Sequence, residues 1–375
     1  MSSALTDLFP HPIVQAPMAG GVSVPRLAAA VSEAGGLGFL AAGYKTADGM
    51  YQEIKQLRSL TGRPFGVNLF LPQPEHPAGT GSTGAADAAP SCAAAVDVYA
   101  HQLSGEAAWY GTELGDPESG RDDGFEAKLA VLLDNPVPVV SFHFGAPSRE
   151  VVDSLHRAGT FVLVTATTAE EARAVERAGA DAVIAQGVEA GGHQGTHRDV
   201  PETDGTGLGL LSLVAQVREA VGIPVVAAGG IMRGCQIAAV LAAGASAAQL
   251  GTAFLATHES GAHALHKRAL TNPLFVRTEL TRAFSGRPAR GLVNRFLREH
   301  GPYAPAAYPE VHHLTAPLRK AAAEAGDAQG MALWAGQGHR MARELPAGQL
   351  VEVLAGELAA ARTALSSFPA GGAGR

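Results

Sequence analysis

The sequence predicts an α/β fold: a closed (β/α)8 barrel with an insertion after the third strand and a C-terminal helical extension. Eight short apolar runs occupy the first 255 residues, and helical segments with recognisable ends separate them. Because most runs are continuously apolar, they indicate parallel strands covered by helices. Of the 375 residues, 46% are hydrophobic, which is enough for a large core.

The eight expected strands are residues 12–18, 36–43, 65–71, 138–145, 160–167, 181–187, 224–230 and 247–255. Helix ends are also readable. Ser23 is expected to cap a helix that stops at Gly35. Thr168 and Glu171 predict a capping box for a helix that stops at Gly179. Repeated strands with helices between them favour a closed barrel.

The expected barrel spans residues 1–260, and an insertion of about residues 72–125 interrupts it. Within the insertion, residues 72–95 are rich in Pro, Gly, Ser and Ala and predict a long loop. Residues 261–366 are expected to be a mostly helical extension that packs on the barrel. Residues 367–375 are expected to be a disordered tail.

Charge and hydropathy exclude several classes of function. The net charge is −7, from 28 basic and 35 acidic residues, and no basic stripe is present, so we expect no nucleic-acid partner. No apolar run is long enough to cross a membrane, and no signal peptide is evident, which predicts a cytoplasmic protein. A homodimer is the only macromolecular assembly that we keep open.

Polar residues fall at the same end of several expected strands, and in such a barrel this end carries the chemistry. Asn68, His143 and Gln186 belong to the third, fourth and sixth strands, and Met18 ends the first. The two amides could bind a flat heteroaromatic ring or be satisfied core amides. His143 could line the same pocket or pack inside the barrel.

The seventh and eighth strands end in a pattern that is typical of phosphate binding. Gly229 and Gly230 allow close approach of backbone N–H groups, and the helix start that follows favours an anion. The run Gln249, Leu250, Gly251 and Thr252 offers further donors beside them. The alternative is a simple tight turn at Gly229 and Gly230; we favour a phosphate site.

The stretch "VEAGGHQGTH" places His193 among Gly191, Gly192 and Gly195. These glycines are expected to make room for a flat ring, and an imidazole can act as a base near neutral pH. The alternative is a histidine in a surface loop. His197 is expected to face solvent.

Two segments resemble known binding motifs but do not match them. "GGLGFLA" fits a dinucleotide fingerprint, but its glycines lie within a strand instead of after it. "HESGAH" has one residue too many between Glu259 and His263 for the zinc-binding motif H-E-x-x-H. No metal site is expected.

The chain resembles the nitronate monooxygenases, formerly called 2-nitropropane dioxygenases. The blocks that carry this resemblance are "QAPMAGGVSVPRLAAAVSEAGGLGFL", "GVNLF", "SFHFGAPS", "AQGVEAGGHQG", "PVVAAGGI", "QLGTAFLATHES", "TRAFSGRPARGLVNRF" and "LWAGQ". They span nearly the whole chain, excluding the polar insertion and the tail.

The resemblance implies a TIM barrel that binds FMN without a covalent link. It implies oxidative denitrification of alkyl nitronates, such as propionate 3-nitronate, by O2 to give a carbonyl compound and nitrite. His193 matches the family's active-site histidine, and His143 matches a second pocket histidine. The matched FMN positions are Asn68, Gln186, Gly191, Gly230 and Gln249 through Thr252.

Two related activities stay open as alternatives. Flavin-dependent enoyl-acyl carrier protein reductases share "EAGGH" and use NAD(P)H, and quinone reductases are a further option. Gln186 and the C-terminal blocks favour the nitronate activity.

Overall fold

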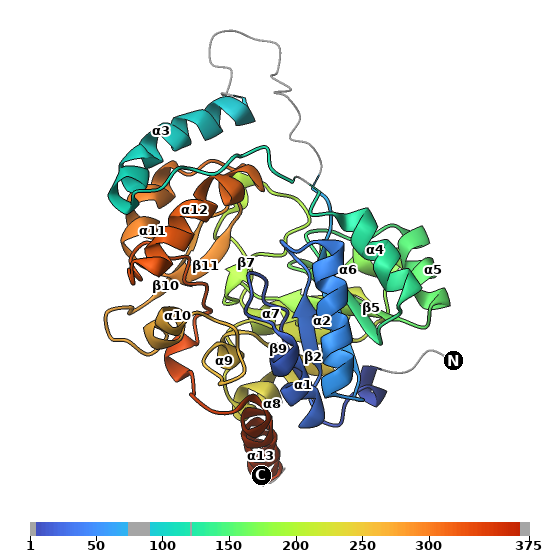
Figure 1. The fold of residues 1–375 in the computed structure, drawn as a ribbon. Coiled ribbons are helices and arrows are strands. Elements are labelled where there is room, and N and C mark those ends of the chain that lie inside the picture. Colours follow the sequence, from blue (N-terminus) through green and yellow to red (C-terminus); the bar gives the residue numbers. More distant parts are fainter. Residues whose placement is uncertain (1–4, 74–90, 121, 368–375) are drawn as a thin grey trace.

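Eight parallel strands form the centre of the computed structural model, which describes residues 5–73, 91–120 and 122–367 (Figure 1). The strands are β1 (Ile13–Gln15), β2 (Gly38–Ala41), β3 (Phe65–Phe70), β4 (Val139–His143), β5 (Phe161–Ala166), β6 (Ala182–Gln186), β8 (Val225–Ala228) and β9 (Ala247–Leu250). Their order is β1-β9-β8-β6-β5-β4-β3-β2, and a parallel bridge between Val14 and Leu37 joins the two ends. The predicted barrel is confirmed.

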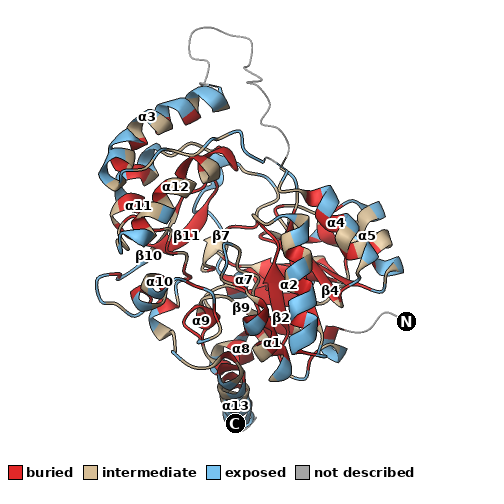
Figure 2. Ribbon diagram, in the orientation of Figure 1, coloured by how far each residue is buried: buried red, intermediate tan, exposed pale blue. Residues whose placement is uncertain are grey.

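The strands are apolar throughout because both faces of the sheet are buried. In β4, Val139 belongs to the cluster inside the barrel, while Val140 belongs to the cluster between sheet and helices. Figure 2 shows the strands in the colour of buried residues and the outer faces of the helices in that of exposed ones. Gly66 has a packing role, because a Cβ there would overlap the buried ring of Phe39.

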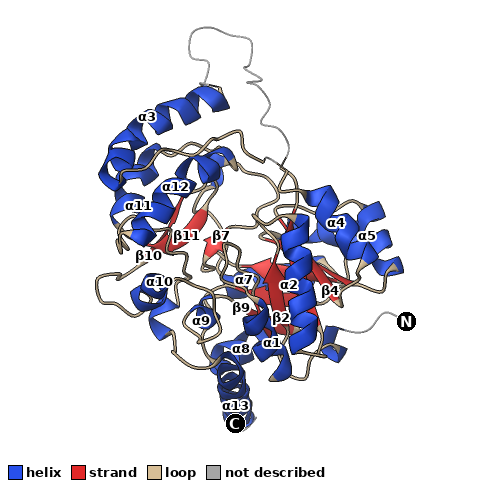
Figure 3. Ribbon diagram, viewed as in Figure 1, coloured by secondary structure: helices blue, strands red, loops and turns tan. Residues whose placement is uncertain are grey.

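Helices surround the central strands (Figure 3), and eight of those in the described residues form the outer layer of the barrel. Seven follow strands in sequence: α1 (Pro25–Glu33), α2 (Ala47–Leu60), α4 (Phe125–Asp134), α5 (Arg149–Arg157), α6 (Ala169–Ala178), α7 (Leu210–Ala220) and α8 (Gly234–Ala242). The eighth is α13 (Ala347–Ser366), which packs on α8 and α1. Helix α13 therefore completes the outer layer of helices, and the expected division near residue 260 does not describe this packing.

A second group of elements covers one side of the barrel. A three-stranded antiparallel sheet contains β7 (Gly192–His193), β10 (Thr278–Thr281) and β11 (Ala289–Leu292). Its helices are α3 (Cys92–Tyr110), α10 (Ala264–Ala269), α11 (Arg295–His300) and α12 (Glu310–Glu324). Helix α3 comes from the insertion, yet it packs on α12 of the C-terminal segment (Figure 1). Insertion and extension thus form one unit.

Several local expectations change. The extension expected to be mostly helical contains β10 and β11, and the end of the eighth expected strand is helix α9 (Thr252–Leu255). The expected loop 72–95 ends in the start of α3, and residues 74–90 lie outside the described part. The expected tail also lies outside it from residue 368 onward. No helix in the described residues is long and apolar enough to cross a membrane.

The helix-cap predictions have mixed outcomes. Thr168 Oγ1 accepts a hydrogen bond from Glu171 N at 3.1 Å, which is one half of the predicted capping box, and α6 stops at Gly179 with φ +90°. The Glu171 carboxylate reaches back to Thr167 N at 2.6 Å instead of to Thr168 N. Ser23 does not cap α1. Its hydroxyl accepts from Met18 N at 2.9 Å and so fixes the turn after β1.

Candidate active site

A cavity of about 340 Å³ lies where the eight strands end. All of the residues predicted for the site line it, from six of the strands and their following loops. They are Met18, Asn68, His143, Gln186, Gly191, His193, Gly229, Gly230, Gln249, Leu250, Gly251 and Thr252. The structure therefore brings the predicted residues together around one cavity, while the role of each residue stays a prediction.

Strand register explains why these side chains converge. In the sheet, Asn68 is paired with Ser141, and Phe70 with His143, so neighbouring strands present their last residues to the same end. Asn68 Nδ2 donates to Ser141 Oγ at 2.9 Å, which fixes the plane of the amide. Asn68 Oδ1 has no hydrogen-bond partner among the described residues and remains available to a ligand.

The loop after β6 is held by Gln186. Its Oε1 accepts from Gly195 N at 2.7 Å, and its Nε2 donates to His193 O at 3.1 Å. On the other side of the loop, His193 pairs with Ala289 of β11. The Gln186 amide, which was predicted to bind a ligand, therefore uses hydrogen bonds to hold the loop that carries His193.

Packing within the protein requires two of the glycines around His193. A Cβ at Gly191 would overlap Gly336 N, and one at Gly195 would lie 2.7 Å from the Cε1 of His143. Gly192 has open space around it but needs φ +74°. The expectation that the glycines clear space for a bound ring is therefore wrong at Gly195, where the chain fills that space and which does not line the cavity; for Gly191, which lines it, the expectation stays a prediction.

His193 is enclosed by rings and held by a hydroxyl. Its Nε2 lies 2.9 Å from Ser285 Oγ. The rings of Phe144, Tyr308 and Trp334 each lie 5.7 Å from its centroid. Burial, followed by the charges of His143 and Arg287, lowers the pKa of His193 to about 3. The imidazole is therefore neutral at physiological pH, and it is not a surface-loop histidine.

His143 lines the cavity beside His193. Its ring centroid lies 4.5 Å from that of Phe144. Burial and then the charge of Arg287 lower the pKa of His143 to about 3. Both histidines thus enter the cavity uncharged. His197 does not face solvent as expected, because it is half-buried and its Nε2 lies 2.8 Å from Thr165 O.

Comparison with known proteins places this geometry in a family. The family model described as nitronate monooxygenase matches residues 2–357. The chain belongs to the nitronate monooxygenase family. It is therefore an enzyme, a flavin-dependent oxidoreductase.

Individual relatives agree with this assignment. A nitronate monooxygenase from Pseudomonas aeruginosa is 45% identical, and the match covers 94% of this chain and 99% of the relative. The solved structure of nitroalkane oxidase from Streptomyces ansochromogenes is 81% identical, with a TM-score of 0.92, and the match covers 97% of this chain and 100% of that one. FabK from Thermotoga maritima is 31% identical, with a TM-score of 0.72, over 97% of this chain and 98% of its own.

Sequence reasoning missed part of the cavity of this nitronate monooxygenase family member. The missed residues include Tyr44 after β2, His312 and Arg319 on α12, and Trp334 near the loop to α13. Ser285 was missed in the same way. No strand-end signal could have found the last four, because they belong to the segment that follows the barrel strands.

Two further histidines, His263 and His266, also line the cavity. His266 Nε2 lies 2.9 Å from Trp334 O, and His263 Nδ1 accepts from Leu265 N at 3.3 Å to cap α10. Both nitrogens are thus used within the fold.

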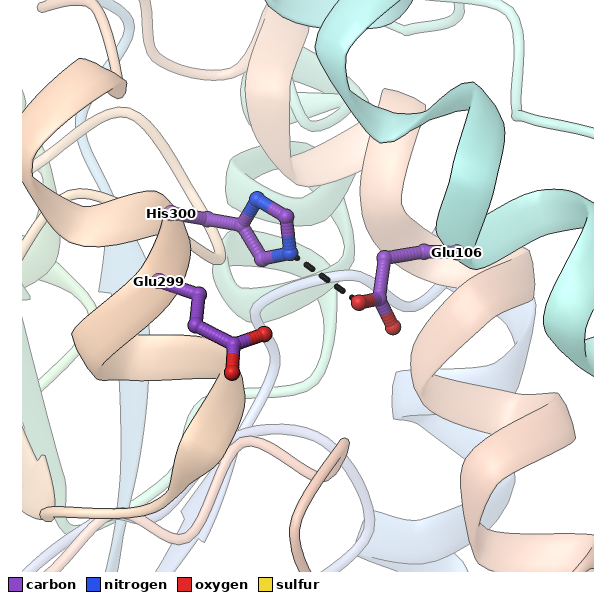
Figure 4. Close-up of side chains that lie close together, drawn as sticks. All are labelled: Glu106, Glu299 and His300. Atoms are coloured by element: carbon purple, nitrogen blue, oxygen red, sulfur yellow. Dashed lines mark hydrogen bonds and ion pairs between the residues drawn. The ribbon is translucent and has the colours of Figure 1, made fainter.

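A separate cluster of Glu106, Glu299 and His300 has the residue types of a metal site (Figure 4). Their candidate ligand atoms lie within 4.8 Å of one another. However, Arg295 already forms a bidentate ion pair with Glu106 and a 2.9 Å pair with Glu299. A cation would have to displace this guanidinium, so the contacts favour a clip that joins α3 to α11.

Proposed function

We propose that this enzyme uses FMN to oxidise alkyl nitronates with O2, giving a carbonyl compound and nitrite. The observation that carries the proposal is the neutral imidazole of His193, which lines the cavity at the ends of the barrel strands. The chain that presents it belongs to the nitronate monooxygenase family. The 81% identity to a nitroalkane oxidase supports substrates of the same chemical kind.

Unpaired amide oxygens in the cavity are suited to the polar edge of a flavin ring. Gln249 Oε1 is buried without a hydrogen-bond partner in the described chain. The hydrogen bonds of the Asn68 amide in the described residues use its Nδ2, which leaves Oδ1 to a ligand. Both atoms line a cavity whose other walls include apolar residues such as Met18 and Ile184. An amphipathic ring with N–H and carbonyl edges would satisfy such amides and cover the apolar surface.

The tips of β8 and β9 suit the phosphate. Gly229 and Gly230 have φ values of +138° and +67°, a conformation that glycine adopts readily. The N–H groups of Gly230 and Gly251 donate to no other group among the described residues. Unpaired backbone donors attract an anion. Thr252 Oγ1 accepts from Gly336 N at 2.9 Å, which leaves its own hydroxyl proton to donate.

When bound, FMN would supply the electron transfer between the nitronate and O2. The chain's own contribution is position and proton transfer. A nitronate has already lost its α-proton and needs no base, whereas a neutral nitroalkane must lose that proton first. His193 is neutral and can accept it. Burial lowers the pKa of His193, and negative charge that develops on the substrate beside the ring would raise it.

The first experiment measures the cofactor. The purified holoenzyme is expected to be yellow and to release FMN on denaturation. A colourless protein that cannot be reconstituted with FMN would contradict the proposal.

The second experiment separates this activity from the reductase alternative. Propionate 3-nitronate is expected to cause O2 consumption and nitrite release without NADH. Rapid anaerobic reduction of the flavin by NAD(P)H, with none by the nitronate, would instead identify an enoyl or quinone reductase.

A further inference from the structure

The contact between His193 and Ser285 has a direction that the neighbouring hydrogen bonds reveal. A neutral imidazole has one N–H donor and one bare nitrogen, and the partner of one nitrogen decides the state of the other. The hydrogen bond of the His193 ring within the described chain uses Nε2, which lies 2.9 Å from Ser285 Oγ. A hydroxyl and an imidazole can each donate, so the other bonds of Ser285 decide which one does.

The proton of the Ser285 hydroxyl is already used. Ser285 Oγ donates to the main-chain oxygen of Arg287 at 3.2 Å. Arg287 is 1% exposed, and its main-chain oxygen accepts from no other donor in the described residues. A buried carbonyl without a partner is unfavourable. The hydroxyl therefore gives its proton to Arg287 and presents a lone pair to Nε2, so His193 is the donor in the bond that they share.

The turn that carries Ser285 is held on several sides. Arg282, at its start, donates from Nη1 to Gly286 O at 2.8 Å. The same guanidinium forms ion pairs of 2.6 Å with Asp199 and Asp204. Gly286 needs φ +79°, and a Cβ there would overlap a main-chain oxygen. The position of the Ser285 hydroxyl is therefore fixed by the fold and does not depend on a bound substrate.

The second nitrogen of the ring is left to the cavity. His193 lines the cavity, and the bond to Ser285 leaves its Nδ1 unused. The described lining contains no Asp or Glu that would hold a proton on Nδ1 by accepting from it. Burial lowers the pKa of His193 to about 3, so the ring is neutral. Nδ1 therefore keeps a lone pair that a ligand in the cavity can reach.

We propose that Ser285 is a positioning residue that holds His193 as the Nε2–H tautomer and makes Nδ1 the atom that removes the α-proton of a neutral nitroalkane. In this step the α-carbon gives its proton to Nδ1. The electron pair of the broken C–H bond stays with the substrate, which becomes a nitronate. The tautomer rests on the hydrogen bonds alone, whereas its use as a base rests on the proposed function.

The same hydrogen bonds stabilise the product of the proton transfer. Once Nδ1 is protonated, the imidazolium donates from Nε2 to Ser285 Oγ in a charge-assisted hydrogen bond, which is stronger than the neutral one. The hydroxyl in turn donates to the main-chain oxygen of Arg287, and such chains of hydrogen bonds strengthen one another. Ser285 therefore assists substrates that still carry the α-proton, and the oxidation of nitronates should not depend on it.

The first test reads the tautomer directly by NMR. In holoenzyme labelled with 15N at its 14 histidines, the signals of His193 are those that disappear in His193→Asn. Ring nitrogens with and without a proton have well-separated 15N resonances. At neutral pH we expect a proton on Nε2 and none on Nδ1. The reverse pattern, with the proton on Nδ1, would overturn the proposal.

Substitutions test whether Ser285 is responsible. Ser285→Ala should give a mixture of both tautomers, and Ser285→Thr, which retains the hydroxyl, should restore the Nε2–H form. The matched control is Ser32→Ala, which should leave His193 unchanged. Ser32 is also buried, and its hydroxyl donates to Pro64 O at 2.9 Å and accepts from Gly38 N at 3.1 Å. A pure Nε2–H tautomer in Ser285→Ala, with a melting temperature that shows a folded protein, would mean that Ser285 does not set it.

Kinetics connect the tautomer to the proposed reaction. Ser285→Ala is expected to lower kcat/KM for nitroethane roughly 3- to 10-fold, the usual effect of losing one hydrogen bond. The kcat/KM for the nitronate of nitroethane should change little. Equal losses on both substrates would overturn the role of Ser285 in proton removal. If an enzyme with the Nε2–H tautomer turns over neither substrate, the proposed function and the role of Nδ1 as a base are wrong, but the tautomer is not.

Discussion

The buried histidines predict that this enzyme loses stability in mild acid. The pKa of His143 falls from 6.5 to about 3 on folding, mainly because burial penalises the charged form. Between these two values the unfolded chain binds more protons than the folded one. Stability therefore decreases as the pH falls below about 6.5, and the loss is complete only near pH 3.

The magnitude follows from the width of that pH window. From pH 6.5 to pH 5 the cost is about 1.4 kcal/mol for each pH unit, or about 2 kcal/mol for His143. The substitution His143→Gln removes the titrating ring. The free energy of unfolding of this variant should therefore fall by about 2 kcal/mol less than that of the unaltered protein between pH 7 and pH 5.

Chemical denaturation of the holoenzyme at both pH values provides the measurement. Val140→Ala is the control, because Val140 is a buried, non-titrating neighbour in β4 and its loss should cost the same at either pH. If His143→Gln loses as much stability between pH 7 and pH 5 as the unaltered protein, burial of a neutral imidazole is not the source of the acid sensitivity.

Three further predictions concern the site and its supports. His193→Asn should lower kcat/KM for neutral nitroalkanes more than for nitronates; equal losses would mean that the ring only positions the substrate. Gly195→Ala should cost about 1–3 kcal/mol of stability, because its Cβ would lie 2.7 Å from His143 Cε1, and thermal melting measures this cost. Glu106→Gln weakens the half-buried pair with Arg295 and should cost about 1–3 kcal/mol. Limited proteolysis should then cut near α3 faster, and an unchanged rate would contradict the clip between α3 and α11.

The amino-acid sequence by itself determined the barrel and the place of its site. Continuous apolar runs report burial on both faces, and parallel strands must all end on the same side. Asn68, His143, Gln186 and Gln249 could therefore be placed together from their positions near strand ends, although they lie far apart along the chain. Local patterns were sufficient because the barrel topology brings the ends of all its parallel strands to one side.

Tertiary structure alone decided which distant segments complete the site. Three contacts join segments that lie far apart in sequence: the pairing of β7 with β11, the hydrogen bond between His193 and Ser285, and the packing of α13 on α1. The pattern of apolar residues along the sequence indicates whether a residue is buried, but not which other residues it packs against. For that reason Gly195 was taken as space for a ligand when it is space for His143, and Arg319 was not foreseen. Packing of the C-terminal segment over the strand ends, rather than any local motif, sets the charge of the cavity.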